Sequence, residues 1–231
     1  MVYNNWKKYL NTFIQINPLE LAGRGKRFKT PLYDNFDKAL SDLYDLIKNE
    51  IDGERYALFG HSLGGLLACE LAFKLSESGN TQPTHLFISG MYPLHIKCKT
   101  SYHQMPYEEF KREINGKDSF EESIFKDQRL ADIFLPILQT DYKIMENYQY
   151  VPKSEKLNCN LTVMGCENDR ETVGNDFLSW RQYTNKEVDF HEFEGGHFFI
   201  NEKMQEVISL VNRTLSQYMD EESDDESIIF G

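Results

Sequence analysis

Residues 58–66, which read LFGHSLGGL, decide the fold of this chain. The apolar run at the start of this stretch predicts a β-strand, and residues 66–75 predict a helix soon after it. Gly-x-Ser-x-Gly between a strand and a helix is typical of a nucleophile elbow, a strained turn that exposes a serine hydroxyl at the edge of a sheet. Such a turn needs almost no side chain two residues before and after the serine, and Gly60 and Gly64 meet that need. Ser62 is therefore the candidate nucleophile; the alternative is a glycine-rich turn with an incidental serine.

Length and composition predict a globular protein of one large domain. The 231 residues are 40% hydrophobic and 27% charged, which is typical of soluble domains. No apolar run approaches the ~20 residues of a membrane span, and the N-terminus lacks a signal core, so we expect a cytoplasmic protein without membrane contact. The net charge of −12 argues against binding to nucleic acid. The four cysteines lack metal-like spacing, so we expect free thiols and no metal.

The acidic residues are concentrated at the end of the chain. Six of them lie between residues 220 and 226. This composition predicts a disordered acidic tail over 220–231 after a domain that spans 1–219.

Strand and helix patterns alternate along the chain, which predicts a mostly parallel sheet flanked by helices. The expected strands cover residues 12–17, 55–59, 84–89, 161–164 and 188–193. The clearest other helices cover residues 36–47 and 204–218, and the first of these is capped by Asp34 or Asn35.

The alternation stops over about 91–158. Short helical patterns occur here around residues 107–114, 120–125 and 133–148. A connection of this length is seldom structureless in a compact domain. We interpret it as a helical lid over the strand ends, where open α/β sheets bind ligands; the alternative is a plain structural insertion.

In proteins with a nucleophile elbow of this kind, the catalytic residues follow one another along the chain in the order serine, acid, histidine. This order guides the choice of the acid and the histidine. Among the histidines after Ser62, we favour His197 because it follows a predicted strand in a glycine-rich loop that reads FEGGHFF. The acid should follow the preceding strand, where Asp169 is our choice and Glu167 the competitor.

These residues predict the roles of a hydrolase triad. His197 takes the proton of Ser62 as the oxygen attacks an acyl carbonyl, and Asp169 fixes the tautomer of His197 and stabilises its cation. The backbone N–H of Leu63 donates to the developing oxyanion. His61 is interpreted as packing or as the wall of the substrate pocket.

The chain resembles the type II (external) thioesterases that serve non-ribosomal peptide and polyketide synthetases. The resemblance spans nearly the whole chain. The segments that carry it are GHSLGG at 60–65, LAGRGKR at 21–27, SGMYP at 89–93, LPILQTDY at 135–142 and FEGGHFF at 193–199.

The resemblance implies an α/β-hydrolase fold with a helical lid. It implies hydrolysis of acyl thioesters from the phosphopantetheine arm of an acyl or peptidyl carrier protein, with no cofactor. Met91, in one of the matching segments, is assigned to substrate binding, and we expect a monomer. The basic residues Arg24, Lys26, Arg27 and Lys29 are candidates for docking an acidic carrier; the alternative is a solvated loop.

The chain departs from the family in one place. The family usually begins with a strand and a Phe-Pro-x-Ala-Gly-Gly-like loop before the segment that matches residues 2–10. That strand would lie between the strands at 12–17 and 55–59, and its loop supplies a second oxyanion donor. Its absence would leave a gap in the sheet with unpaired backbone groups. Either the sequence starts late, or the sheet has closed up and activity is impaired, so we predict poor folding or weak turnover. The alternative functions are a carboxylester hydrolase with the same triad and a truncated, impaired protein that only binds a synthetase.

Overall fold

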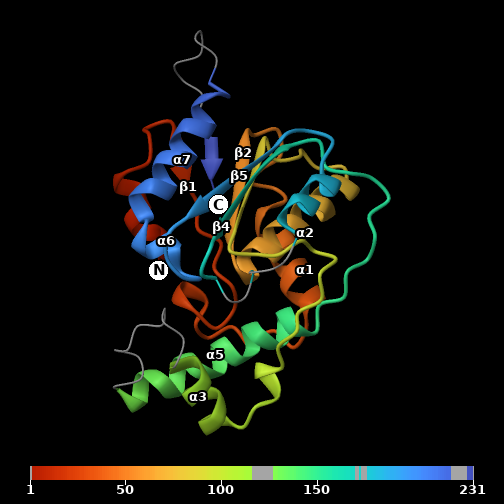
Figure 1. The fold of residues 1–231 in the computed structure, drawn as a ribbon. Helices are drawn as coiled ribbons and strands as arrows, with labels where there is room; N and C mark the ends of the chain where they lie inside the picture. The colour runs from red at the N-terminus through yellow and green to blue at the C-terminus, as the bar shows by residue number, and fades with distance from the viewer. Residues whose placement is uncertain (1, 116–126, 170–171, 173–175, 220–227, 231) are drawn as a thin grey trace. The chain divides into compact units, whose positions relative to one another are not determined.

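The computed structural model describes residues 2–115, 127–169, 172, 176–219 and 228–230 (Figure 1). The chain divides into two compact units. The first comprises Met1–Leu19, Asp42–Pro93 and Lys153–Gly231, and the second comprises Glu20–Ser41 and Leu94–Pro152. The division falls within helix α1 (Phe36–Ile47).

The first unit is built on a parallel sheet in the order β1-β6-β2-β3-β4-β5. The strands are β1 (Ile14–Ile16), β2 (Tyr56–His61), β3 (His85–Ser89), β4 (Asn160–Cys166), β5 (Val188–Phe193) and β6 (Ile228–Phe230). The first five lie where the sequence predicts strands, although β1 is shorter than expected and β2 and β4 run two residues further. The prediction of a mostly parallel α/β sheet is confirmed.

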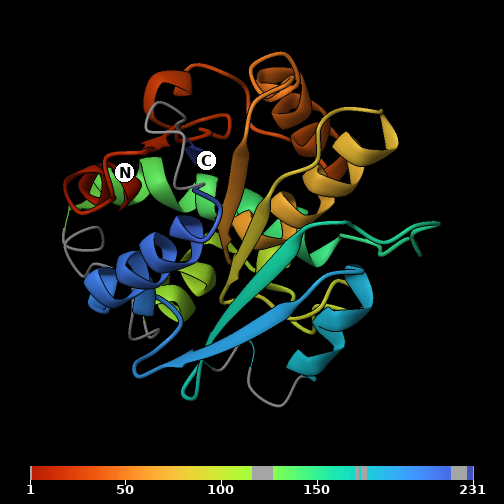
Figure 2. The same ribbon diagram turned by 90° about the horizontal axis from the view of Figure 1, so that it is seen from above.

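Helices cover both faces of this sheet (Figure 2). In the first unit they are η1 (Val2–Lys8), α2 (Leu63–Glu77), η4 (Phe177–Tyr183), α6 (Phe199–Glu202) and α7 (Met204–Ser216). A buried cluster joins η1, α6 and α7 to one face of the strands, and α2 lies on the other face. No helix among the described residues is both long and apolar enough to cross a membrane.

Local signals in the sequence explain where two helices begin and end. The Asn35 side chain accepts a hydrogen bond from the Lys38 N–H at 2.9 Å, so Asn35 rather than Asp34 caps α1. Helix α2 ends before Gly79, whose φ of +77° lets the chain turn away as the Asn80 N–H bonds back to the Leu75 carbonyl at 3.0 Å.

The second unit contains η2 (Gly25–Arg27), η3 (Tyr102–Gln104), α3 (Tyr107–Asn115) and α5 (Gln128–Glu146). Apolar side chains of α3 and α5 form their own buried cluster. The helical patterns predicted around 107–114 and 133–148 are confirmed, and the pattern at 120–125 lies outside the described residues. The interpretation of about 91–158 as a lid stays a prediction.

The basic loop of the second unit is partly engaged within the unit. Arg24 forms a two-pronged ion pair with Asp141, with N–O distances of 2.7 and 3.1 Å. Arg27 donates to the Glu20 carbonyl at 2.9 Å. The four cations expected as one docking surface therefore divide into two partly buried arginines, which have acceptors within the unit, and the exposed Lys26 and Lys29.

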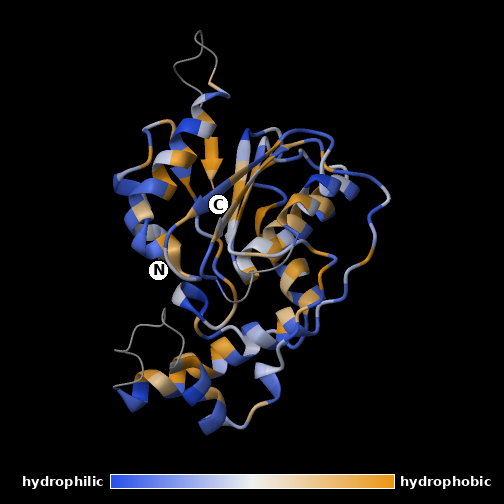
Figure 3. Cartoon of the chain, in the orientation of Figure 1, coloured by the Kyte–Doolittle hydropathy of each residue, from blue (hydrophilic) through white to orange (hydrophobic). Residues whose placement is uncertain are grey.

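Strand β6 overturns two expectations. Residues 228–230 belong to the stretch predicted as a disordered tail, yet they form a strand with Ile228 and Phe230 almost fully buried. Residues 220–227 lie outside the described residues. The strand also occupies the position between β1 and β2 where the sequence predicted a gap, and it is apolar throughout (Figure 3). The sequence analysis missed this strand because it classified residues 220–231 by their acidic composition, and the apolar stretch at 228–230 is only three residues long.

Candidate active site

Ser62 lies on a sharp turn between β2 and α2. Its φ of 54° and ψ of −124° make it the one non-glycine residue with positive φ in the described part of the chain. Such a conformation costs of order 1–3 kcal/mol and persists only where the surroundings enforce it. Here the Ser62 N–H donates to the Ser89 carbonyl of β3 at 2.8 Å, and the Ser62 carbonyl accepts from Gly65 at 2.8 Å and Leu66 at 3.2 Å. The turn has the geometry that a nucleophile elbow requires.

The glycines around the serine are required to different degrees. A Cβ on Gly60 would lie 2.0 Å from the Gly64 carbonyl oxygen, so any side chain there clashes with backbone. A Cβ on Gly65 would lie 3.2 Å from both the Gly60 oxygen and the Met91 Cβ. A Cβ on Gly64 meets no described atom within 4 Å. The steric demand expected at Gly64 therefore falls on Gly65 instead.

The start of α2 lies directly beside the serine. Leu63 is the first residue of the helix, so its N–H is one of the donors that no intrahelical carbonyl can satisfy. Such N–H groups and the positive end of the helix dipole favour negative charge. This is the local environment that an oxyanion donor needs.

Asp169 and His197 are joined by a hydrogen bond. The Asp169 Oδ2 and the His197 Nδ1 are 2.9 Å apart. Asp169 is fully buried, and its N–H closes a turn to the Cys166 carbonyl at 3.2 Å directly after β4. Glu167 is exposed in the same loop. Asp169, not Glu167, is the carboxylate that contacts the histidine.

The loop before His197 is tied to the end of β4. The Cys166 thiol donates to the Gly195 carbonyl, and Gly195 has a φ of +122°, a conformation that favours glycine. The Phe199 N–H bonds to the Gly196 carbonyl at 3.0 Å and starts α6. These contacts place the histidine between two anchored segments, with only 10% of its side chain exposed.

The imidazole of His197 lies against the residues that flank the elbow. Its ring centroid is 4.9 Å from that of His61, the residue before Ser62. A Cβ built on Gly90, the residue after β3, would lie 3.5 Å from the His197 Cε1. The first unit therefore brings together the serine turn, the histidine and its carboxylate from three separate segments of sequence.

His61 packs beside the histidine of the pair. Its Nδ1 is 3.0 Å from the Ser89 hydroxyl, and its Nε2 is buried without a partner among the described residues. Burial, and then the charge of His197, lower the pKa of His61 to about 3, so the ring is neutral at ordinary pH. Ser89, which supports both His61 and Ser62, was not among the predicted site residues, although it lies at a strand end and opens the matching segment at 89–93.

Met91 is only 2% exposed and lies beside Gly65 in the protein interior. Its assignment to substrate binding stays a prediction. Within the described residues, no group of three or more His, Cys, Asp or Glu side chains could hold a metal ion.

Comparisons with known proteins agree with this geometry. A family model described as a thioesterase domain matches residues 1–215. The chain is 30% identical over 224 residues to the linear gramicidin dehydrogenase LgrE of Brevibacillus parabrevis, covering 94% of this chain and 84% of that protein. It is similar to the crystal structure of ClbQ from the colibactin pathway, with a TM-score of 0.89, 31% identity, and coverage of 94% and 91%. It is also similar to the type II thioesterase BorB from the borrelidin cluster, with a TM-score of 0.75, 26% identity, and coverage of 85% and 79%.

Proposed function

We propose, from the premise that this chain belongs to the thioesterase domain family, that Ser62, Asp169 and His197 hydrolyse acyl groups from the phosphopantetheine arm of a carrier protein. The chain is a type II thioesterase, a serine hydrolase of non-ribosomal peptide and polyketide pathways. The observation that supports this triad most directly is the 2.9 Å contact between the buried Asp169 and His197, whose ring lies beside the elbow.

The reaction proceeds in two acyl-transfer steps. The His197 Nε2 takes the proton of Ser62 while Oγ attacks the thioester carbonyl, and the Leu63 N–H stabilises the oxyanion. The pantetheine thiolate leaves with the proton from His197, and the acyl group remains on Ser62. Water then attacks this ester while His197 takes its proton, and His197 returns that proton to the Ser62 oxygen as the free acid leaves. Asp169 holds Nδ1 and stabilises the imidazolium in both steps.

The gap that the sequence analysis expected in the sheet is filled by β6, which removes the reason to expect poor folding. The weak turnover expected there stays a prediction.

The exposed lysines support the choice of partner. Lys26 and Lys29 are exposed, whereas Arg24 and Arg27 already have acceptors within the unit. We propose that the two lysines contact an acidic carrier. Lys26→Glu with Lys29→Glu should weaken hydrolysis of the carrier-bound acyl group and spare a small acyl thioester, and equal loss on both substrates argues against docking there.

A cytoplasmic location belongs to the same proposal. All four cysteines, Cys69, Cys98, Cys159 and Cys166, are free thiols. Free thiols persist in a reducing compartment, which supports this location.

The test compares substrates and labels the nucleophile. The full chain should hydrolyse acyl groups from a phosphopantetheinylated carrier faster than aryl esters, and a fluorophosphonate should label the chain but not its Ser62→Ala variant. Faster hydrolysis of aryl esters would instead indicate a carboxylester hydrolase. Absence of both labelling and turnover would indicate a protein that only binds its synthetase.

A further inference from the structure

Strand β6 holds an inner position of the sheet. It pairs in parallel with β1 along its whole length and with β2 at Ile229 and Phe230. The Ile229 N–H donates to the Arg55 carbonyl at 3.1 Å, and the Phe230 carbonyl accepts from the Asn17 N–H at 2.6 Å. Because β1 and β2 are not neighbours in the described sheet, a chain without β6 would present two facing strand edges with unpaired backbone groups.

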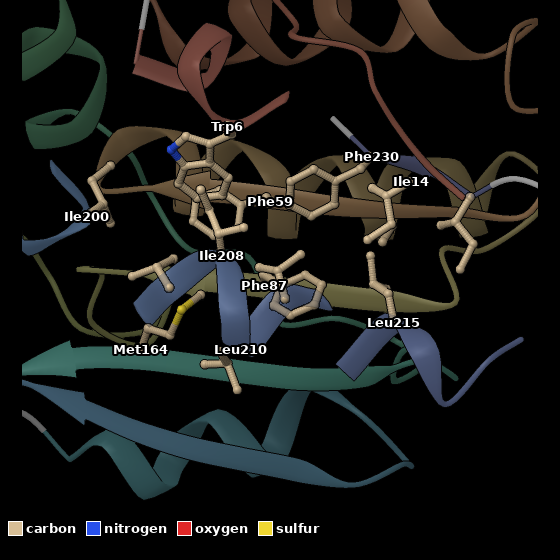
Figure 4. Close-up of a cluster of buried hydrophobic side chains, with 14 of the residues drawn as sticks. Trp6, Ile14, Phe59, Phe87, Met164, Ile200, Ile208, Leu210, Leu215 and Phe230 are labelled. Carbon is tan, nitrogen blue, oxygen red and sulfur yellow. The ribbon is translucent and has the colours of Figure 1, made fainter. Parts of the chain in front are cut away.

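The side chains of β6 fit apolar contacts on one face of the sheet (Figure 4). Ile228 and Phe230 are 0% and 1% exposed. The Phe230 ring centroid is 5.7 Å from Phe59, 5.9 Å from Phe87 and 6.3 Å from Trp6. Side chains of a strand alternate between its faces, so Ile228 and Phe230 lie on the same face. The sheet therefore offers two apolar positions two residues apart, which fit the pattern Ile-x-Phe.

We propose that the groove between β1 and β2 is a strand-binding site whose ligand is a parallel, extended Ile-x-Phe peptide, supplied in cis by residues 228–230 of this chain. Main-chain hydrogen bonds to both edges give such a site its affinity, and pockets for alternate side chains give it specificity and register. The strand has only three residues, so its register depends on the few side-chain and main-chain contacts that it makes in the groove.

Occupancy of the groove also bears on the catalytic turn. Phe230 is opposite Ala57 of β2, and β2 ends at His61 directly before Ser62. With the groove empty, β2 keeps only β3 as a neighbour, and the strained turn loses support on one side. This consequence for activity rests on the proposed function, whereas strand binding does not.

The test separates the segment from a chain that has already folded. A protease recognition sequence is inserted after Met219 of the full chain, and the folded protein is then cut. A fluorescein-labelled peptide of residues 224–231, DDESIIFG, is the probe. After dialysis removes the cut segment, the Tm should fall by about 10 °C because two buried apolar side chains are lost. The labelled peptide should bind with saturable anisotropy and restore both the Tm and thioester hydrolysis.

Control peptides test the register. A peptide with Phe230→Asp should fail to bind, because it places a charge in the aromatic cluster. A peptide with Ile229→Thr should bind like the original, because this side chain is only half-buried. If the cut protein aggregates once the segment has left, cutting in the presence of excess labelled peptide must still give a labelled, folded complex.

Three results would overturn the proposal. The cut protein fails to take up the labelled peptide under either protocol, or loss of the segment leaves the Tm unchanged. Alternatively, the intact chain is a dimer by light scattering and becomes monomeric with Phe230→Asp, so that the strand comes from a second copy. If the peptide binds and restores the Tm but no thioester or ester is hydrolysed, strand binding is upheld and the proposed function fails.

Discussion

Ser62 is held in a backbone conformation that L-amino acids rarely adopt, and the residues around it explain how it is held. Hydrogen bonds from its own N–H to Ser89 and from Gly65 to its carbonyl fix the turn. Asp169 in turn fixes His197, and the buried carboxylate has the imidazole N–H as its partner. Each of these contacts is a single hydrogen bond. Substitutions that remove one hydrogen bond and keep the size of the side chain therefore test the site best.

Asp169→Asn should lower kcat by about 10,000-fold with little change in KM, because an amide cannot hold the productive tautomer of His197 or stabilise its cation. Steady-state hydrolysis of an acyl thioester measures this. Glu167→Gln is the matched control, since Glu167 is exposed in the same loop, and it should retain full activity. A comparable loss in the Glu167 variant would contradict the assignment.

His61 should remain neutral throughout the useful range of pH. Burial and the neighbouring His197 hold its pKa at about 3, so its imidazole signals should not shift between pH 5 and 8 in NMR titration. The acidic limb of kcat/KM therefore does not come from His61, and His61→Gln should leave that limb in place. A limb that disappears with this substitution would make His61 part of the proton transfer.

The sequence predicted the residues of the candidate triad better than it predicted the contacts that hold them in place. Ser62 and His197 could be found because the elbow and the glycine-rich loop have local signatures. The choice between Asp169 and Glu167 could not be settled, because it depends on how the loop after β4 folds: Asp169 is buried in it and Glu167 is exposed. Ser89 was missed because its role arises from pairing between β2 and β3.

At the scale of elements, the junction of β2 and α2 is a close approach of two backbones. The helix starts so near the strand that a Cβ on Gly60 would lie 2.0 Å from the Gly64 oxygen. The motif in the sequence correctly indicated glycine at position 60. It could not show that position 64 points into open space while position 65 faces Met91, because this depends on how the helix leaves the turn.

Substitutions across the three glycines should therefore have opposite effects. Gly64→Ala should stabilise the protein by about 0.5–1 kcal/mol, since alanine restricts the unfolded chain and meets no clash. Gly60→Ala should abolish the folded elbow, since backbone must move, and Gly65→Ala should be intermediate. Urea unfolding combined with turnover measures all three, and a Gly64→Ala variant less stable than the parent protein would contradict the geometry.

A second buried histidine makes strand β3 sensitive to acid. The His85 ring lies between the Tyr218 hydroxyl at 2.9 Å and the Thr162 hydroxyl at 2.8 Å, and burial lowers the pKa of His85 to about 4. The unfolded chain, with a pKa of 6.5, takes up a proton at pH 5 that the folded chain does not. Folding stability from this group is therefore complete above pH 6.5 and falls as the pH drops toward 4.

The expected loss at pH 5 is about 2 kcal/mol relative to pH 7. Urea unfolding at the two pH values measures it in the parent protein and in His85→Gln, which cannot titrate. The difference between pH 7 and pH 5 should be smaller by that amount in the variant. An equal difference in both proteins would show that His85 does not carry the effect.

At the scale of the whole molecule, the sheet order shows what local patterns cannot reveal. Five strands were predicted from apolar runs and their spacing. The sixth was missed because three residues after an acidic stretch give almost no periodic signal, and its identity as a strand depends on two edges formed by β1 and β2 far away in the sequence. The expected gap was located correctly, but its occupant came from the opposite end of the chain.

Phe230→Ala should lower the free energy of unfolding by about 3–5 kcal/mol, because the ring is buried against three aromatic side chains. Ile229→Ala is the matched control on the half-buried side of the same strand and should cost about 1 kcal/mol. Chemical denaturation of both variants measures the difference. Equal costs would indicate that β6 does not hold the register described.

The inner position of β6 has a consequence for biosynthesis. The ribosome makes β1 and β2 early, but the segment that separates them emerges after almost everything else. Until then the nascent polypeptide carries two open strand edges, which are ready templates for pairing with other chains. The sheet can therefore be completed only after residues 228–230 have left the ribosome, and until then both edges are exposed to pairing with other chains.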